Sequence, residues 1–390
     1  VDTHHMYGGN IIGKYSKHLA NDSNLDLQVY YDFVGRTADE FGQKLHTLDF
    51  DAQHTFDPIE GHQFIWGAGY RMVYADMQES LLVRYPFGDD ETLHILSAFA
   101  QDKIELMPNE LFLTLGSKIE YNSYTDFEMQ PNARLAWIPD EDQTVWGAVT
   151  KAVRMPSIIE NKMTQVAAGI PGSGGLVAIS ANPNLQSETL IAYELGYRNQ
   201  PLEDVSFDAT IFRNEYDDLR TIEPGGITGG DITVGQHTDN LGERTTTGFE
   251  LATNWEVTNQ WQLSGSYSYL DMDFARKPGS ADTVARSEDG KSPTNMYSVR
   301  SHYIFDDQWE LDGAVYYSGE ISGNTTNNIK NIGAYTRADL KLTWKPSEGI
   351  EAALIGQNLL DDSHQEFGAS YYSIPYEIPR SVYGKVTLRF

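Results

Sequence analysis

The sequence predicts an all-β protein, an antiparallel transmembrane β-barrel, and three observations carry this prediction. Apolar and polar residues alternate along segments of roughly ten to fifteen residues, which is long for strands of ordinary globular proteins. The connections between these segments alternate between very short turns and mostly long, polar, Gly-rich loops. Nearly all tryptophans lie beside the short turns. Short turns at one end, long loops at the other and an aromatic girdle at a fixed height are typical of membrane barrels.

Alternation is clearest in residues 203–215, because side chains point to opposite faces along a strand. One face carries Val205, Phe207, Ala209 and Ile211, and the other carries Ser206, Asp208, Thr210 and Asn214. Segments 249–255 and 261–269 repeat the pattern. We therefore expect the apolar face of each strand to meet lipid and the polar face to line a lumen.

Two sets of connections are expected. The short turns lie near residues 20–24, 57–61, 106–109, 139–143, 200–203, 257–260, 305–308 and 346–349. The long loops lie near 74–91, 154–186, 218–243, 273–292, 320–333 and 362–379. The tryptophans that we assign to the girdle are Trp66, Trp137, Trp146, Trp255, Trp261, Trp309 and Trp344.

The last segment, SVYGKVTLRF, sets the direction of the strands. Val382, Val386, Leu388 and Phe390 share one face, and the chain ends on the aromatic Phe390. An apolar face with a terminal aromatic resembles the assembly signal of outer-membrane barrels, so we assign that role to Val386, Leu388 and Phe390. The short turns are then periplasmic and the long loops face outside.

Counting the segments gives about 17 strands, an odd number, whereas bacterial single-chain barrels have an even number. An unpaired edge would expose backbone N–H and C=O groups to lipid. We therefore expect residues 1–390 to be one partial β-barrel domain, with strands missing at the N-terminal end. No signal peptide is recognised at Val1.

Composition excludes several classes of function. The formal charge of −28 argues against nucleic acid as a partner, because phosphate binding needs clustered Lys and Arg. The acid excess fits solvated loops and a polar lumen. No cysteine is present, so disulfides and Cys-based metal sites are excluded. No segment approaches the 18 or so apolar residues of a transmembrane helix.

Several segments resemble successive strands of the TonB-dependent outer-membrane receptors, in that family's order. They are VTKAVRMPS (149–157), LQSETLIAYELGYR (185–198), VSFDATIFRNEYDDLRT (205–221), NLGERTTTGFELATNW (240–255), IGQNLLDD (355–362) and the terminal PRSVYGKVTLRF. Each motif alone is weak, but the ordered set is specific and covers most of the chain.

The resemblance implies a 22-stranded barrel in the outer membrane of a Gram-negative bacterium. It implies active uptake of a scarce nutrient, most often a ferric siderophore, with energy from TonB. The family's plug and TonB-contacting segment are not recognised in this chain, nor are roughly five strands. Partners would be lipid, a ferric chelate, TonB through the absent segment and the barrel-assembly machinery. A passive porin or a structural barrel is the alternative, and a porin would show shorter loops and one loop folded inward.

The sequence has no recognisable catalytic motif. No HExxH, GxSxG, Walker or GxGxxG pattern occurs, so no enzyme and no cofactor is expected. Asp2, His4 and His5 could bind a metal, but adjacent histidines at a terminus are more often incidental, and no metal site is assigned. The acidic pairs at 89–90, 306–307 and 361–362 lie in loops, turns or strand ends, where a calcium site would need oxygens from several loops. A soluble lectin is a further all-β alternative, which extraction without detergent would identify.

Ligand contacts in such a barrel come from loop residues and the upper lumen. Cations and aromatics suit a negatively charged ferric catecholate or hydroxycarboxylate. The candidates are Arg154, Met163, Arg220, His237, Arg286, Lys291, Tyr371, Tyr372, Tyr376 and Arg380. Each could instead be an ordinary exposed loop residue.

Overall fold

The computed structural model describes residues 5–20, 23–38, 41–169, 175–226, 228, 231–282, 290–322, 331–366 and 376–389. Strands dominate it, and the short helix α1 (Ile158–Lys162) lies in a connection between two of them. Within these residues, no helix has the length and apolar character needed to cross a membrane.

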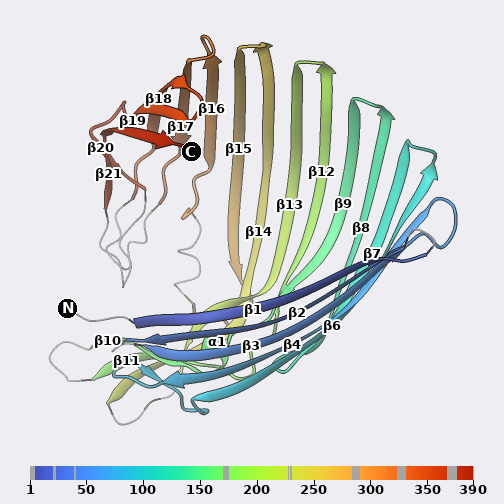
Figure 1. Ribbon diagram of the computed structural model, residues 1–390. Helices are drawn as coiled ribbons and strands as arrows, with labels where there is room; N and C mark the ends of the chain where they lie inside the picture. Colours follow the sequence, from blue (N-terminus) through green and yellow to red (C-terminus); the bar gives the residue numbers. More distant parts are fainter. Residues whose placement is uncertain are drawn as a thin grey trace.

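A single curved wall of antiparallel strands makes up most of the protein (Figure 1). Its strands are β1 (His5–His18), β2 (Asn24–Thr37), β3 (Gly42–Phe56), β4 (His62–Gln78), β6 (Asp90–Met107), β7 (Leu111–Asn122), β8 (Asp126–Asp140), β9 (Gln143–Arg154), β12 (Glu188–Leu202), β13 (Val205–Pro224), β14 (Ile232–Thr258), β15 (Trp261–Arg276), β16 (Asn295–Ile304), β17 (Trp309–Ser318), β18 (Tyr335–Ser347), β19 (Ile350–Gln357) and β22 (Ser381–Leu388). The remaining strands are β5 (Val83–Arg84), β10 (Thr164–Gly169), β11 (Leu176–Ser180), β20 (Ser363–Gln365) and β21 (Glu377–Pro379).

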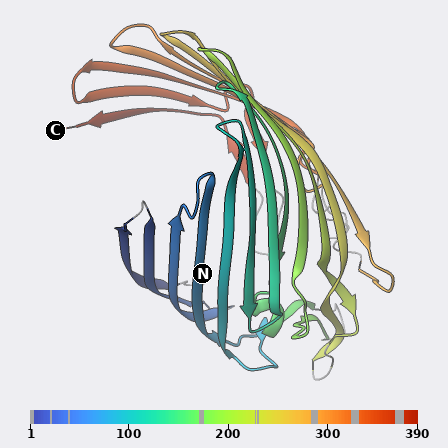
Figure 2. The same cartoon turned by 90° about the vertical axis from the view of Figure 1, so that its right-hand side faces the viewer.

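Each wall strand pairs antiparallel with the next in the order given, so the wall holds 17 strands, as the sequence predicts. Strands β1 and β22 each pair with one wall neighbour in the described chain. Figure 2 shows the C-terminal strand standing apart from the N-terminal strands across the open side of the wall. The predicted fold class is therefore confirmed, as an open antiparallel wall.

All eight predicted short turns connect the strands where the sequence places them, at one end of the wall. The connections at the other end depart from the prediction in one place. Residues 218–243 are mostly strand, because β13 continues to Pro224 and β14 begins at Ile232. A membrane strand needs only about 9–11 residues, and β13 and β14 have 20 and 27. Their outer ends therefore extend beyond the bilayer.

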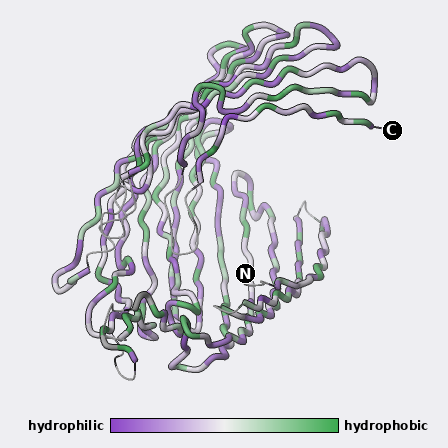
Figure 3. Tube along the Cα trace, turned by 90° about the vertical axis from the view of Figure 1, so that its left-hand side faces the viewer, coloured by the Kyte–Doolittle hydropathy of each residue, from purple (hydrophilic) through white to green (hydrophobic). Residues whose placement is uncertain are grey.

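The two faces of the wall differ in polarity as predicted, and Figure 3 shows hydrophobic and hydrophilic residues alternating along the strands. On the outward face Ile211 is 56% exposed, and it is the last apolar residue of its row in β13. The next residues of that row are Arg213 and Glu215, which form an ion pair with Nε to Oε1 at 2.9 Å. In β13 the outward face thus changes here from apolar to charged side chains.

The tryptophan girdle is confirmed for six residues and wrong for Trp146. Trp66, Trp137, Trp255, Trp309 and Trp344 are exposed on the outward face, and Trp261 is half-buried there. Trp146 pairs in register with Ala136 and Gly196, which places it on the inner face. The guanidinium of Arg134 lies over its ring at 4.9 Å from the centroid. A cation–π contact with Arg134 therefore holds Trp146 on the lumen side of the wall.

Gly196 is required by the position of the Trp146 ring. A Cβ at Gly196 would lie 2.3 Å from two atoms of the indole, whereas a Cβ at Gly147 would lie 3.6 Å from its nearest neighbour. We expect Gly196→Ala to lower the free energy of unfolding by about 1–3 kcal/mol, since overpacking costs that much. Gly147→Ala is the matched control and should change it by much less. Urea unfolding in lipid vesicles, followed by tryptophan fluorescence, measures both; equal costs would contradict the assignment of Trp146 to the lumen.

Proline explains where the wall opens toward the lumen. Pairing of β8 with β9 ends at Asn132 and Thr150, next to Pro131. Proline has no N–H to donate to a neighbouring strand. The outer end of β9 therefore has no pairing with β8. Val153 and Met155 line a cavity together with Lys118 and Glu120 of β7. The connection that follows β9 therefore starts on the inner face, at the end of the wall opposite the short turns. We call this end the mouth.

Candidate functional site

The described parts of the connection from β9 to β12, residues 155–169 and 175–187, form an inner strap at the outer end of the wall. The strap contains α1, β10 and β11. Strand β10 pairs with β5 on one side, and β11 pairs in parallel with the outer end of β14 on the other. Figures 1 and 2 show these elements within the curve of the wall. The strap therefore joins two parts of the wall that are far apart in its strand order.

Helix α1 is short, and its first turn is fixed by a capping box. Ser157 is the N-cap; its Oγ accepts from the N–H of Glu160, while the Glu160 carboxylate accepts from the N–H of Ser157. This reciprocal pair satisfies two N–H groups that a helix start leaves free. Glu160 is thereby held in one orientation at the mouth.

Four charged residues, which we call the mouth network, converge at this point: Arg154, Glu160, Glu188 and Arg220. Arg154 donates two hydrogen bonds to Glu188, at 2.7 and 2.8 Å, and two to Glu160, at 3.1 Å each. Arg220 Nη1 donates to Glu160 Oε1 at 2.9 Å. The network joins the ends of β9, β12 and β13 to α1, and its two arginines and two glutamates balance in charge.

Glu160 is the buried centre of the network, with 7% of its side chain exposed. Burial by itself raises the pKa of its carboxyl, but the hydrogen bonds from Arg154 and Ser157 outweigh burial and lower the pKa to about 2. The carboxylate is therefore charged at any physiological pH. The strap is held to the wall by a charge-assisted contact that neutral pH does not weaken.

Apolar contacts fasten the same part of the strap from α1. Met163 and Ile158 pack against a buried cluster of Ala75, Met77, Val83 and Tyr85 from β4 and the β4–β6 connection. Lys162 adds an ion pair with Glu91 at 2.6 Å. The structure therefore places Met163, a predicted ligand contact, in packing between the strap and the wall, because a thioether suits an irregular apolar gap.

The other predicted ligand residues do not gather at one point. His237 lies in β14 beside the strap, with Nε2 4.0 Å from Asp239. Lys291 and Tyr376 are exposed in the β15–β16 and β19–β22 connections, and Arg380 pairs with Asp362 at 3.1 Å near β21. Among the candidates that the structure describes, only Arg154 and Arg220 meet, and they meet on Glu160. His4, Arg286, Tyr371 and Tyr372 lie outside the described residues, as does Phe390 of the assembly signal.

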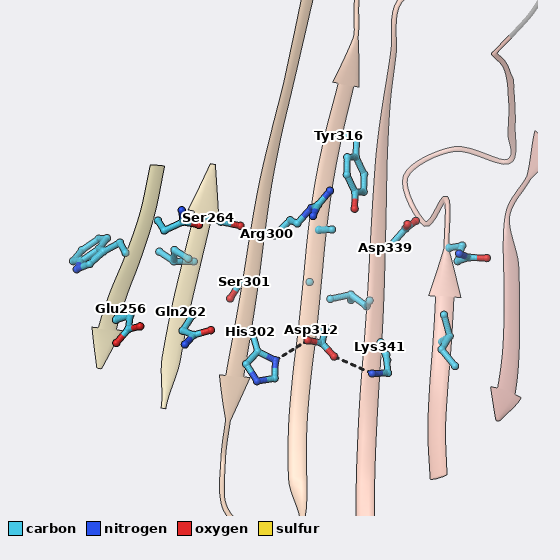
Figure 4. Close-up of a pocket in the computed structure, with 18 residues that line it drawn as sticks. Glu256, Gln262, Ser264, Arg300, Ser301, His302, Asp312, Tyr316, Asp339 and Lys341 are labelled. Carbon is cyan, nitrogen blue, oxygen red and sulfur yellow. Dashed lines mark hydrogen bonds and ion pairs between the residues drawn. The ribbon is translucent and has the colours of Figure 1, made fainter. Parts of the chain in front are cut away.

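A groove of about 700 Å³ lies on the inner face over β14 to β19 (Figure 4). Asp312 is its centre: Oδ1 is 2.7 Å from His302 Nδ1, and Oδ2 is 3.3 Å from Lys341 Nζ. Arg300 also lines the groove, with its guanidinium 5.6 Å from the centre of the Tyr316 ring. These side chains belong to alternate, inward-facing positions of their strands. The groove can hold polar or charged groups by hydrogen bonding.

A second polar arrangement lies close to this groove. Arg337 donates to both carboxylate oxygens of Asp339, at 2.9 and 2.7 Å. Asp339 also accepts from the N–H of Asn358, whose side chain donates to the carbonyl of Ile378 in β21. Asn358 is fully buried and has a φ of +53°. This contact fixes the β20–β21 hairpin to the inner wall and gives the motif IGQNLLDD a structural role.

The groove and the mouth network offer polar and charged groups for binding. Among the described residues, no three histidine, aspartate or glutamate side chains lie close enough together to hold a metal ion. Sequence reasoning missed Glu160, Glu188 and the groove around Asp312. The pattern Ser157-x-x-Glu160 is a capping-box signature and could have identified α1.

Comparison with known proteins agrees with this architecture. The family model described as "TonB dependent receptor-like, beta-barrel" matches residues 5–359. A probable TonB-dependent siderophore receptor, PiuA, of Acinetobacter baumannii is 24% identical over 307 residues, covering 74% of this chain and 40% of the relative. The iron-regulated outer membrane virulence protein of Vibrio cholerae is 24% identical over 283 residues, covering 70% and 42%. The chain thus spans about two fifths of the length of these relatives.

Solved structures show the same fold at low sequence identity. The ferric enterobactin receptor PfeA of Pseudomonas aeruginosa superposes with a TM-score of 0.79 at 17% identity, over 99% of this chain and 63% of that one. The siderophore receptor PirA of Acinetobacter baumannii superposes with a TM-score of 0.79 at 16% identity, over 100% and 63%. At such identities the likeness is one of fold.

Proposed function

Because this chain belongs to the TonB-dependent receptor family, whose members are outer-membrane proteins, we propose that it forms the wall of a receptor for the active uptake of a ferric siderophore. The family match over residues 5–359 is the observation that carries the proposal. The relatives support it, since they include a probable siderophore receptor and an iron-regulated outer membrane virulence protein.

On this proposal the protein resides in the outer membrane of a Gram-negative bacterium, with the short turns in the periplasm. TonB would act through a segment outside these 390 residues. The barrel-assembly machinery would read the last strand, where Val386 and Leu388 are 69% and 61% exposed on the outward face. The inner wall is polar enough to carry a hydrated solute, and its groove offers His302, Asp312 and Lys341.

A passive porin is the second candidate, and one observation favours it. The inner strap folds toward the lumen, as a constriction loop would. The connection that contains it is long, however, at residues 155–187, and the family match extends on both sides of it. A receptor whose strap narrows its mouth accounts for the inward fold of the strap, the length of the connection and the family match.

Transport measurements separate the two candidates. We expect the full-length gene, expressed in an iron-starved host that lacks its own siderophore receptors, to restore uptake of a radiolabelled ferric chelate. Uptake should require TonB, and it should disappear in the same host without TonB. Uptake that persists without TonB would contradict active transport and would support the porin.

A further inference from the structure

The arginines at the mouth are occupied by glutamates of the same chain. Arg154 directs both Nη atoms and Nε to Glu188 and Glu160, and Arg220 directs Nη1 to Glu160. The backbone N–H of Arg220 also donates to Glu188, at 2.9 Å. A bidentate arginine with two carboxylate partners has few donor positions left for a third anion.

Turning Arg154 toward a ligand would leave Glu188 without its side-chain ion pair and Glu160 with Arg220 alone. Turning Arg220 toward a ligand would leave Glu160 with Arg154 alone. Glu160 has 7% of its side chain exposed and Glu188 has 17%. Removing one partner of a buried ion pair is strongly unfavourable, because the remaining charge is neither solvated nor paired. Binding of an anionic ligand to Arg154 or Arg220 would therefore first have to offset the free energy lost when the arginine leaves its glutamate.

Other cations of the outer connections are engaged in the same way. Arg84 donates to both oxygens of Asp231 at 2.9 and 2.7 Å, and Lys162 pairs with Glu91 at 2.6 Å. Lys277 lies 2.5 Å from both Asp217 and Asp218. Each of these pairs joins two different connections or strand ends, so the cations serve to hold the mouth together.

Carboxylates are in excess in the same region. Between residues 218 and 243 the chain has one arginine, Arg220, and five acids: Asp218, Glu223, Asp231, Asp239 and Glu243. Glu243 is exposed, and Asp239 has 40% of its side chain exposed. This local surplus of acids, in a chain of net charge −28, favours cations over anions at the outer end of the wall, and the effect is strongest at low ionic strength.

We infer that the ligand of this receptor is a metal chelate that is neutral or positively charged, such as a trihydroxamate type, and is not a trianionic tris-catecholate. The inference rests on the proposed function and narrows its substrate class. It assigns Arg154 and Arg220 to holding the strap, and it leaves recognition to amide, hydroxyl and carboxylate groups of the mouth.

A binding panel with the full-length receptor in detergent tests the inference. The probes are three ferric chelates of similar size: a trianionic tris-catecholate, a neutral trihydroxamate, and the same trihydroxamate with one added ammonium group. We expect at low salt that the neutral or the cationic chelate binds at least tenfold more tightly than the tris-catecholate. The advantage of the cationic chelate over the neutral one should shrink as salt is added, because screening weakens the acidic field.

Two variants make the test specific to the mouth. The substitution Asp239→Asn removes a partly exposed negative charge beside the strap and should narrow the difference between the cationic chelate and the tris-catecholate. Asp26→Asn, in the periplasmic half of β2, is the control and should leave that difference unchanged. Tight binding of the tris-catecholate, equal to or above that of the other chelates, would overturn the inference and leave iron uptake standing. Failure of all three chelates to bind would overturn the proposed function and this inference together.

Discussion

Replacing Glu160 with glutamine is expected to loosen the inner strap while the wall stays folded. The variant keeps the size of the side chain and its helix-capping hydrogen bond, but it removes the charge that Arg154 and Arg220 share. A pKa lowered from 4.5 to about 2 corresponds to about 3 kcal/mol, at about 1.4 kcal/mol per unit. Local opening should thus become roughly a hundredfold more frequent.

Amide hydrogen exchange measures this opening at the N–H groups of Met163 and Val166, which donate to Ile159 and Leu82. Glu215→Gln is the matched control, because it breaks an exposed ion pair with Arg213 in the outer part of β13. Exposed pairs contribute at most about 1 kcal/mol, so this variant should leave the strap's exchange unchanged. Equal exchange of the strap in wild type and Glu160→Gln would show that the mouth network does not hold it.

The ion pairs of Glu160 with Arg154 and Arg220 make the local stability of the strap depend on pH. The pKa of Glu160 is depressed in the folded protein, so its stabilising contribution is fully present above about pH 4.5, the unfolded value. It is lost as the pH falls through the folded value near 2. Exchange of the Val166 N–H, corrected for its intrinsic pH dependence, should stay constant from pH 7 to about 5 and rise below that. A rise already between pH 7 and 6 would point to a different titrating group.

Arginine in place of Ala209 should destabilise the wall by about 2–4 kcal/mol, the cost of a cation near the bilayer midplane. Ala209 pairs with Tyr197 and Leu251 on the outward face of β13. Thr210→Arg is the matched control one residue away, since Thr210 pairs with Gly196 and Glu250 on the inner face and should cost much less. Folding titrations in lipid vesicles compare the two variants. A larger cost for Thr210→Arg would reverse the assignment of faces.

Much of the wall could be predicted from the sequence, because its signals are local. Alternation along 203–215 places the side chains of β13 on the correct faces, and the turns near 57–61 and 305–308 follow from short breaks in that alternation. Trp146 was misplaced because its nearness to a turn says nothing about which face it occupies. Its parity with Ala148 and Thr150, read against Val145 and Val149, carries that information.

The mouth could not be predicted in the same way, because it depends on contacts between distant segments. Arg154 and Arg220 do approach each other, but the residue that unites them is Glu160, which a sequence search for cations overlooks. The strap turns inward because pairing of β8 with β9 ends beside Pro131. Its strand β11 pairs in parallel with β14, and no local sequence pattern predicts that pairing. The length of the loop near 154–186 was predicted, whereas its path was not.

A cysteine scan of β13 in the full-length receptor tests the central claim that this chain forms a lipid-facing wall around a polar lumen. The chain has no native cysteine, so each introduced thiol is unique in these 390 residues. Cysteines at 205, 207, 209 and 211 should resist a charged, membrane-impermeant thiol reagent and should place an attached fluorophore within reach of a quencher dissolved in lipid. Cysteines at 206, 208 and 210 should react with the charged reagent once it is supplied from both sides of reconstituted vesicles. Alternating labelling with this parity is the result we predict, and uniform labelling or the opposite parity would contradict it.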